Sequence, residues 1–213
     1  MYKAVAFDFD YTLGDTTNGI VQSANYGLKM LGYAEKSVSD IRRTVGLSLN
    51  ETFAALTGSR DEEQSARFAA LFREKADEVM TGSAALYDCV PEVLSELHKT
   101  HKIGIVTTKF HYRIEAILKK FGVFEFVDVI VGGEDVTCEK PEPEGLLKAI
   151  DALGVRKNET LYVGDSLVDA QTAANAGVDF AAVLTGLTAD FSRYDSVFVS
   201  ESVLGIYDFV IKE

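Results

Sequence analysis

Short apolar runs alternate with segments of helical periodicity along most of the chain. The runs lie at residues 3–9, 103–107, 126–131, 160–163 and 180–184, with a weaker one at 196–199. Between them, apolar residues recur at intervals of three and four, as at Ile114, Ile117, Leu118 and Phe121, which predicts amphipathic helices. Strands that alternate with helices predict an α/β fold, with a Rossmann-like three-layer core and a parallel sheet covered on both faces.

The alternation stops between residues 16 and 85, where helical signals follow one another without a convincing strand. One apolar stripe runs through Ile20, Ala24, Leu28 and Leu31, and Ser48 has the capping-box spacing to Glu51. We therefore predict two domains, an α/β core of residues 1–15 and 86–213 and an inserted domain of three or four helices at residues 16–85. The junctions between them are rich in small and hydroxyl residues, which favours linkers that hinge.

Composition indicates a folded globular protein and disfavours two kinds of partner. The 213 residues are 47% hydrophobic, and 21 Lys and Arg against 33 Asp and Glu give a net charge of −12. So acidic a chain without a basic stripe is not expected to bind nucleic acid. Its apolar runs are shorter than the roughly 20 residues of a membrane span, so no membrane association is expected. With no disulfide framework from Cys89 and Cys138 and no export signal at the N-terminus, we predict a cytoplasmic protein.

Polar residues follow the predicted strands at the end where open α/β sheets bind ligands. Asp8 and Asp10 end the first run, and residues two apart on an extended chain project to the same side. Thr107 and Thr108 end the second run, ahead of a helix whose free N–H groups would suit a phosphate. Lys140 adds a cation on a proline-containing loop.

The last polar segment follows the run at 160–163. There Asp165 and Asp169 are four residues apart, the spacing of neighbours on one helical face. Together with Asp8 and Asp10 they would bring four negative charges to one site, so we expect a cation. Mg²⁺ prefers oxygen ligands, and with Mg²⁺ and one lysine the local charge would fall to −1. Protonation of one aspartate would then bring the charge to zero and make a phosphate tolerable.

In this order the four segments resemble the motifs of the haloacid dehalogenase superfamily of phosphatases. The matching residues are Asp8-Phe9-Asp10-Tyr11-Thr12, then Thr107, then Lys140 with Pro141, and then Gly164-Asp165-Ser166 through Asp169. The inserted helical domain resembles the cap of that superfamily. Val45-Gly46-Leu47-Ser48-Leu49 resembles a cap segment of its phosphoglycolate phosphatase-like members.

The resemblance implies a Mg²⁺-dependent phosphatase that acts on a small-molecule phosphate monoester. It implies that Asp8 is the nucleophile, which forms an aspartyl-phosphate, and that Asp10 is the general acid and base. It further implies that Thr107, the Thr108 backbone and Lys140 hold the phosphoryl oxygens. The metal would be held by Asp8, the backbone carbonyl of Asp10 and Asp165, with Asp169 supporting its water shell. Closure of the cap would exclude water and select the substrate.

Two positions depart from commoner patterns of the superfamily. Tyr11 stands where glycine is frequent, and Thr108 stands where asparagine or serine is frequent. Both leave the catalytic groups in place, but they affect the shape of the entrance to the site and therefore the substrate that could be inferred from close relatives. Whether Arg42, Arg43 or Lys109 contacts the substrate stays open, as does the oligomeric state.

Several other functions compete with this interpretation. Hydrolysis of pyrophosphate is one, because residues 105–109 also resemble the second motif of bacterial pyrophosphatases of the superfamily. Phosphotransfer of the β-phosphoglucomutase type ranks lower, because Leu49 stands where those enzymes have arginine. A phospho-receiver-like switch is disfavoured by the chain order. Receivers place the acid pair and the acceptor before the Thr and Lys, whereas here the second acid cluster comes last and a helical insertion follows the first. A catalytically inactive binding protein is disfavoured because every motif position is intact.

Overall fold

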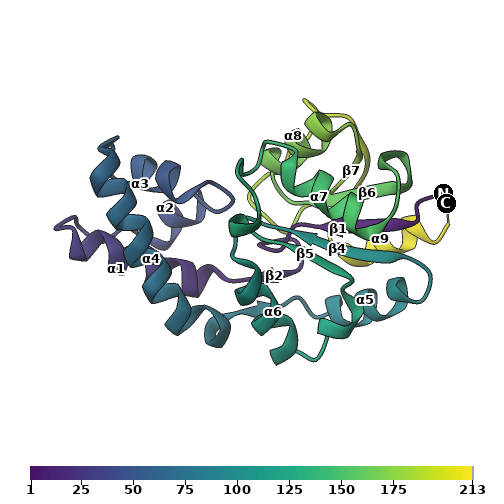
Figure 1. Ribbon diagram of the computed structural model, residues 1–213, viewed down its shortest axis with the longest axis horizontal. Coiled ribbons are helices and arrows are strands. Elements are labelled where there is room, and N and C mark those ends of the chain that lie inside the picture. Colours follow the sequence, from purple (N-terminus) through teal and green to yellow (C-terminus); the bar gives the residue numbers. More distant parts are fainter. Residues whose placement is uncertain (213) are drawn as a thin grey trace. The chain divides into compact units, whose positions relative to one another are not determined.

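The computed structural model describes residues 1–212 (Figure 1). The chain divides into two compact units. One consists of Met1–Gly14 together with the chain from Leu86 onward, and the other consists of Asp15–Ala85. The short strands β2 (Gly14–Asp15) and β3 (Ala85–Leu86) pair with each other where the chain passes from one unit to the other. Strands of two residues have no periodicity that a sequence pattern could reveal.

A six-stranded parallel sheet in the order β5-β4-β1-β6-β7-β8 forms the centre of the first unit, which confirms the predicted α/β fold. Its strands are β1 (Ala4–Phe7), β4 (Lys102–Val106), β5 (Val129–Val131), β6 (Thr160–Gly164), β7 (Asp179–Val183) and β8 (Ser196–Ser200). The central strands β1 and β6 are buried along their whole length. Continuous apolar runs such as these are typical of parallel strands covered on both faces.

Helices cover the sheet on both faces, with α7 and α8 on one side and α5 and α9 on the other (Figure 1). The helices of this unit are α5 (Val90–His98), α6 (His111–Lys120), α7 (Glu144–Leu153), α8 (Leu167–Ala176) and α9 (Val203–Val210), with 3₁₀ turns at Phe124–Phe126, Gly133–Asp135 and Lys157–Glu159. Under α7 and α8, a buried cluster joins Leu146 and Ala173 to Tyr162 and Phe180 of the sheet. Its apolar burial is the main favourable term that holds this layer together.

One strand begins later than the sequence pattern predicts. Phe126, the predicted first residue of the third strand, lies instead in a 3₁₀ turn, and the strand starts at Val129. The ring of Phe126 packs at 6.0 Å from that of His98, so its apolar character serves a contact with α5. Apolar residues in a turn and in a strand look alike in sequence when the two are adjacent.

The second unit contains the helices α1 (Thr17–Met30), α2 (Val38–Arg42), α3 (Leu49–Thr57) and α4 (Glu62–Ser83). The predicted capping box of Ser48 and Glu51 begins α3. In α1 the predicted stripe is buried at Ile20, Ala24 and Leu28. A Cβ on Gly27 would lie 2.9 Å from the Phe68 ring, so this glycine permits the close approach of α1 and α4.

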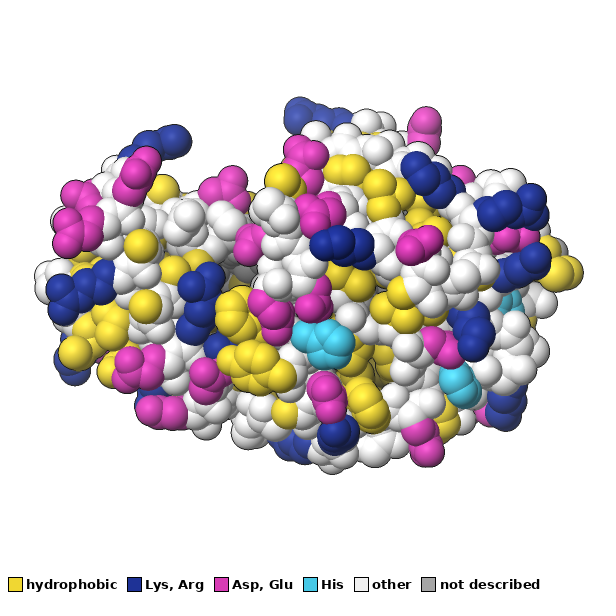
Figure 2. Space-filling view, in the orientation of Figure 1, with side chains coloured by type: hydrophobic (Ala, Val, Ile, Leu, Met, Phe, Trp, Pro, Cys, Tyr) yellow, Lys and Arg dark blue, Asp and Glu magenta, His cyan; other side chains and the backbone are white. Residues whose placement is uncertain are grey.

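The surface carries charges of both signs. On the face drawn in Figure 2, Lys and Arg side chains lie scattered among Asp and Glu side chains. Within residues 1–212, no helix combines the length and the apolar character that crossing a membrane requires.

The register of the sheet places the carboxyl ends of β1, β4 and β6 at nearly the same height. Phe7 of β1 is paired with Ile105 of β4 on one side and with Val163 of β6 on the other. From β1 the chain continues to β4 and β5 on one side, and it returns to β6 and β7 on the opposite side. The order therefore reverses between β1 and β6, the kind of place where open α/β sheets bind ligands.

Candidate active site

Three aspartates gather at the carboxyl ends of β1 and β6. One carboxylate oxygen from each of Asp8, Asp165 and Asp169 lies within 4.8 Å of the others, and all three residues are buried. Asp8 follows β1 directly, and its N–H donates to the carbonyl of Val163 in β6. Because β1 and β6 end at the same height in the sheet, they bring Asp8 close to Asp165 and Asp169, which are more than 150 residues away in sequence.

Lys140 joins two of these aspartates. Its Nζ lies 2.7 Å from Asp8 Oδ1 and 2.7 Å from Asp169 Oδ1, and its side chain is only 6% exposed. Burial by itself would lower the pKa of the lysine, but the carboxylates of Asp169 and Asp8 hold it well above its ordinary value. Lys140 therefore carries a fixed positive charge beside Asp8.

Tyr162 belongs to this cluster, although the sequence patterns did not single it out. Its hydroxyl donates to Asp169 Oδ1 at 3.0 Å and accepts from Lys140 Nζ at 3.2 Å. Burial, together with the negative charge of Asp169, raises the pKa of the phenol well above its ordinary value. A signal existed in the sequence, because a phenol inside a buried strand needs a polar partner.

Asp10 has a different cation from Asp8. Its Oδ2 accepts from Lys109 Nζ at 2.6 Å, and both side chains are less than 10% exposed. The Lys109 N–H also donates to Thr107 Oγ1 at 3.2 Å. The sequence left the role of Lys109 open, and the structure shows it bound to an acid of the site.

Thr107, Thr108 and Lys140 line the same small cavity. The helix that follows them differs from the prediction. It begins only at His111, whose N–H already donates to Glu134 Oε2 at 2.8 Å. The first N–H of α6 is therefore bound to a carboxylate from the loop after β5.

Asp165 and Asp169 do not share a helical face as their spacing suggested. Helix α8 begins at Leu167, and Ser166 is its N-cap in a capping box with Asp169. Asp165 thus lies before the helix, where Thr12 Oγ1 donates to its Oδ1 at 3.4 Å. The turn between β6 and α8 brings the two carboxylates together, and Asp169 both caps the helix and contacts Lys140.

The loop after β7 packs against Asp165. A Cβ on Gly186 would lie 1.8 Å from Asp165 Oδ2, so only glycine fits there without displacement. The neighbouring Thr185 hydroxyl donates to the carbonyl of Tyr11. Tyr11 has a φ of 60°, a backbone conformation that glycine adopts more easily than tyrosine.

Burial and the neighbouring carboxylates change the acidity of Asp8 and Asp165. Burial is the main cause that raises the pKa of Asp8 to about 7, with Asp169 and Asp10 adding to it and Lys140 opposing it. Burial is again the main cause for Asp165, whose pKa rises to about 9 with help from Asp169 and Asp8. Two like charges about 5 Å apart repel by roughly 3 kcal/mol at an effective dielectric constant of about 20. The cluster therefore favours either bound protons or a bound cation.

The donor set fits a hard divalent cation. Asp8, Asp165 and Asp169 offer only oxygen atoms, and no histidine or cysteine belongs to the group within residues 1–212. Oxygen-only sets with few carboxylates are those that Mg²⁺ prefers, whereas zinc sites generally use nitrogen or sulfur.

Of the three basic residues left open by the sequence, Lys109 contacts Asp10 of this site. Arg42 ends α2 in the helical unit. Arg43 follows it and pairs with Asp40 at 3.3 Å on the surface.

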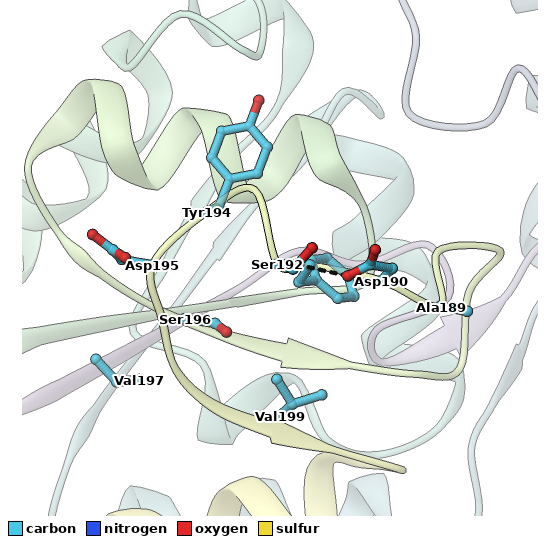
Figure 3. A pocket seen from close by; sticks show the side chains of 9 residues that line it. Ala189, Asp190, Ser192, Tyr194, Asp195, Ser196, Val197 and Val199 are labelled. Atoms are coloured by element: carbon cyan, nitrogen blue, oxygen red, sulfur yellow. Dashed lines mark hydrogen bonds between the residues drawn. The ribbon is translucent and has the colours of Figure 1, made fainter.

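A separate hollow of about 480 Å³ is lined by the segment between β7 and β8 and by residues of β8 (Figure 3). It is lined by Ala189, Asp190, Phe191, Ser192, Tyr194, Asp195, Ser196, Val197 and Val199. Asp190 accepts from the Ser192 N–H at 2.8 Å, so this carboxylate stabilises a turn. None of the predicted site residues lines this hollow.

Several known proteins are similar to this chain. The profile of the haloacid dehalogenase-like hydrolase family matches residues 5–183. Pyrophosphatase PpaX of Halalkalibacterium halodurans is 34% identical over 211 residues, which cover 98% of this chain and 96% of that protein. Pyrophosphatase PpaX of Bacillus velezensis is 34% identical over 181 residues, 84% of this chain and 82% of that protein.

A solved structure is also closely similar. A protein from Bacteroides fragilis, described as a haloacid dehalogenase-like hydrolase, superimposes with a TM-score of 0.93 at 40% identity, and the match covers 97% of this chain and 100% of that one.

Proposed function

We propose, from the premise that this chain belongs to the haloacid dehalogenase-like hydrolases, that it is a Mg²⁺-dependent phosphatase. Membership of the family makes it a hydrolytic enzyme, and the proposal adds the reaction: hydrolysis of a small-molecule phosphate monoester through an aspartyl-phosphate on Asp8. One observation carries it. Asp8 lies at the carboxyl end of the central strand within 4.8 Å of Asp165 and Asp169, with Lys140 at 2.7 Å.

Asp8, Asp165 and Asp169 would hold the Mg²⁺, together with the backbone carbonyl of Asp10. When bound, the ion neutralises carboxylate charge and polarises the phosphoryl group. The charges of the site support this part of the proposal. Four aspartates against Lys140 and Lys109 leave a formal charge of −2, which one divalent cation brings to zero. When Asp10 is protonated, as its role as general acid requires, the formal charge with the cation becomes +1, which suits an anionic phosphate.

In the first step, a carboxylate oxygen of Asp8 attacks phosphorus, and the bond from phosphorus to the ester oxygen breaks. Lys140 holds Asp8 Oδ1 at 2.7 Å and so fixes the orientation of the carboxylate. Thr107, the Thr108 N–H and Lys140 would bind the phosphoryl oxygens and stabilise the charge that develops on them.

Asp10 donates a proton to the departing ester oxygen. In the second step it accepts a proton from the water that attacks the phosphorus of the aspartyl-phosphate. That attack releases inorganic phosphate and returns Asp8 as a carboxylate. In the same proposal, the helical unit of residues 15–85 serves as a cap that selects the substrate and excludes water.

Pyrophosphate is a second candidate substrate, because two relatives that match most of this chain are named pyrophosphatases. Its hydrolysis would use the same attack by Asp8, with phosphate as the leaving group. The two candidates separate in a panel of phosphoglycolate, other alkyl phosphates and pyrophosphate, each assayed with Mg²⁺ and with chelator. A kcat/KM for pyrophosphate at least about 10-fold above that for every ester, equal to about 1.4 kcal/mol, would favour the second candidate.

Asp8→Asn tests the nucleophile. The amide keeps the size of the side chain and removes the attacking oxyanion, so turnover should fall by at least about 10³-fold. With a ³²P-labelled ester, the wild type stopped in acid should carry label that hydroxylamine releases, and the variant should carry none. Asp190→Asn, which changes an acid of the separate hollow, is the matched control and should keep wild-type turnover. Normal hydrolysis by Asp8→Asn would overturn the proposal.

A further inference from the structure

Lys109 is a buried cation of the site that the mechanism above leaves without a chemical role. Its ammonium lies 2.6 Å from Asp10 Oδ2, and its side chain is 9% exposed. Lysine is seldom buried to this extent without a specific partner, and here the partner is the residue that exchanges protons with the leaving group. Ninety-nine positions of sequence separate the two residues.

The backbone of Lys109 is fixed as tightly as its ammonium. Its N–H donates to Thr107 Oγ1, and its carbonyl accepts from the Gly133 N–H at 2.9 Å. A Cβ on Gly132 would lie 2.8 Å from that carbonyl, so the loop after β5 packs directly against it. The lysine therefore extends toward Asp10 from an anchored loop, and an anchored cation restricts where its carboxylate partner can lie.

Asp10 needs such a restraint. It stands beyond the end of β1, in an isolated bridge with Gly14 and beside the left-handed backbone of Tyr11. Proton transfer requires its carboxyl group to be within hydrogen-bonding distance of the ester oxygen, and small displacements of such a group cost large factors in rate.

We propose that Lys109 is a positioning residue, whose ammonium holds the Asp10 carboxyl group in place for proton exchange with the leaving group. This inference rests on the proposed function, and it assigns to Lys109 no direct contact with the substrate. It predicts that the effect of Lys109 is transmitted through Asp10 and depends on how much the leaving group needs a proton.

The test compares two esters on wild type, Lys109→Met, Asp10→Asn and the double variant. An alkyl phosphate such as phosphoglycolate leaves as a basic alkoxide and needs a proton, whereas p-nitrophenyl phosphate leaves as a stable phenolate. Lys109→Met should lower kcat/KM for the alkyl ester by about 10-fold or more and kcat/KM for the aryl ester by less than about 3-fold. The ratio kcat/KM reports the steps up to the aspartyl-phosphate, where only the alkyl leaving group depends on general acid catalysis worth roughly 10²–10⁴-fold. Lys109→Arg, which keeps the charge, should recover part of the loss.

The double variant should be no slower on the alkyl ester than Asp10→Asn alone, because a residue that acts through Asp10 has nothing further to contribute. Lys99→Met is the matched control, since Lys99 pairs with Glu96 on the surface and is 61% exposed. Equal losses for both esters, or losses that multiply in the double variant, would overturn the proposal.

A crystal structure of metal-free Lys109→Met provides a readout that does not depend on activity. The Asp10 carboxyl group should move by about 1 Å or more or adopt another rotamer, and an unchanged Asp10 would overturn the proposal. If the wild type hydrolyses neither ester, the proposed function fails, and the position of Asp10 in this crystal decides the anchoring role alone. Thermal unfolding of each variant identifies any that does not fold. If Lys109→Met does not fold, Lys109→Gln, which also lacks the charge, replaces it in both tests.

Discussion

The hydroxyl of Tyr162 lies 3.0 Å from Asp169 Oδ1 and 3.2 Å from Lys140 Nζ, so one phenol on β6 contacts both partners of a buried ion pair. The Tyr162 side chain connects the hydrophobic core to the candidate active site. Its ring packs in the core, 6.3 Å from the ring of Phe180. Packing of the sheet thereby fixes the position of charges that the proposed chemistry needs.

Tyr162→Phe should keep the ring packing and lose the hydroxyl. Hydrogen bonds to charged groups are worth about 1.5–3 kcal/mol, and Asp169 retains its bonds to Lys140 and Ser166. We expect a loss of about 1–2 kcal/mol in the free energy of unfolding and about a 10-fold lower kcat/KM. Urea unfolding and steady-state kinetics measure the two effects. Tyr194→Phe, whose hydroxyl meets Gln171 at the surface, is the control, and wild-type kinetics in Tyr162→Phe would show that the phenol does not position the pair.

The metal-free protein should become less stable as the pH rises from about 5 to about 9. In an unfolded chain, Asp8 and Asp165 lose their protons near pH 3.8, whereas in the folded protein their pKa values are about 7 and about 9. The folded state therefore binds more protons across this window, and the free energy of unfolding falls by roughly 1.4 kcal/mol per pH unit for each group that is still protonated only in the folded state. Lys140 stays charged throughout because its pKa is held well above its ordinary value.

Urea unfolding in EDTA at pH 6 and pH 8.5 measures this pH effect. The decline should be shallower in Asp165→Asn, which has no carboxyl to protonate, and saturating Mg²⁺ should restore stability most at the higher pH. Stability that is flat or rises with pH in the metal-free wild type would contradict the raised pKa values of Asp8 and Asp165.

Asp165→Asn should weaken Mg²⁺ binding, because it removes one of three carboxylates from the oxygen cluster. We expect the dissociation constant to rise by about 10-fold or more, measured by titration calorimetry on the metal-free protein. Asp190→Asn should bind Mg²⁺ as the wild type does, since Asp190 stabilises a turn in the separate hollow. Equal affinities in all three proteins would place the metal elsewhere.

Gly186→Ala tests the contact between the loop after β7 and Asp165. The new methyl group would lie 1.8 Å from Asp165 Oδ2, so the loop or the carboxylate must move. Expected results are a free energy of unfolding lower by about 1–3 kcal/mol and weaker Mg²⁺ binding. Gly82→Ala is a matched control, because it lies in α4 with no atom within 4 Å of the added Cβ and should be neutral or slightly stabilising. An unaltered Mg²⁺ affinity in Gly186→Ala would mean that the loop does not constrain Asp165.

Much of this protein could be predicted from residues that are close together in sequence. Apolar runs and helical periodicity predicted the strands β1, β4, β6 and β7 to within one or two residues, because burial on both faces imposes a local pattern. The rule that ligands bind beyond the carboxyl ends of parallel strands was enough to predict that Asp8, Thr107 and Asp165 follow strands of one sheet. Local patterns failed at the two-residue strands and at Phe126, where neighbouring elements share one apolar run.

The partners of each charged side chain were beyond local patterns. Lys140 binds Asp8 and Asp169 and Lys109 binds Asp10, although nothing in the spacing of these residues favours one assignment over the other. Strand order and register bring distant segments to the same height, and only then do distance and desolvation select which cation meets which carboxylate. The same holds for the hydroxyl of Tyr162 and the missing side chain of Gly186, because contacts in a close-packed interior depend on three-dimensional proximity that a linear pattern does not encode.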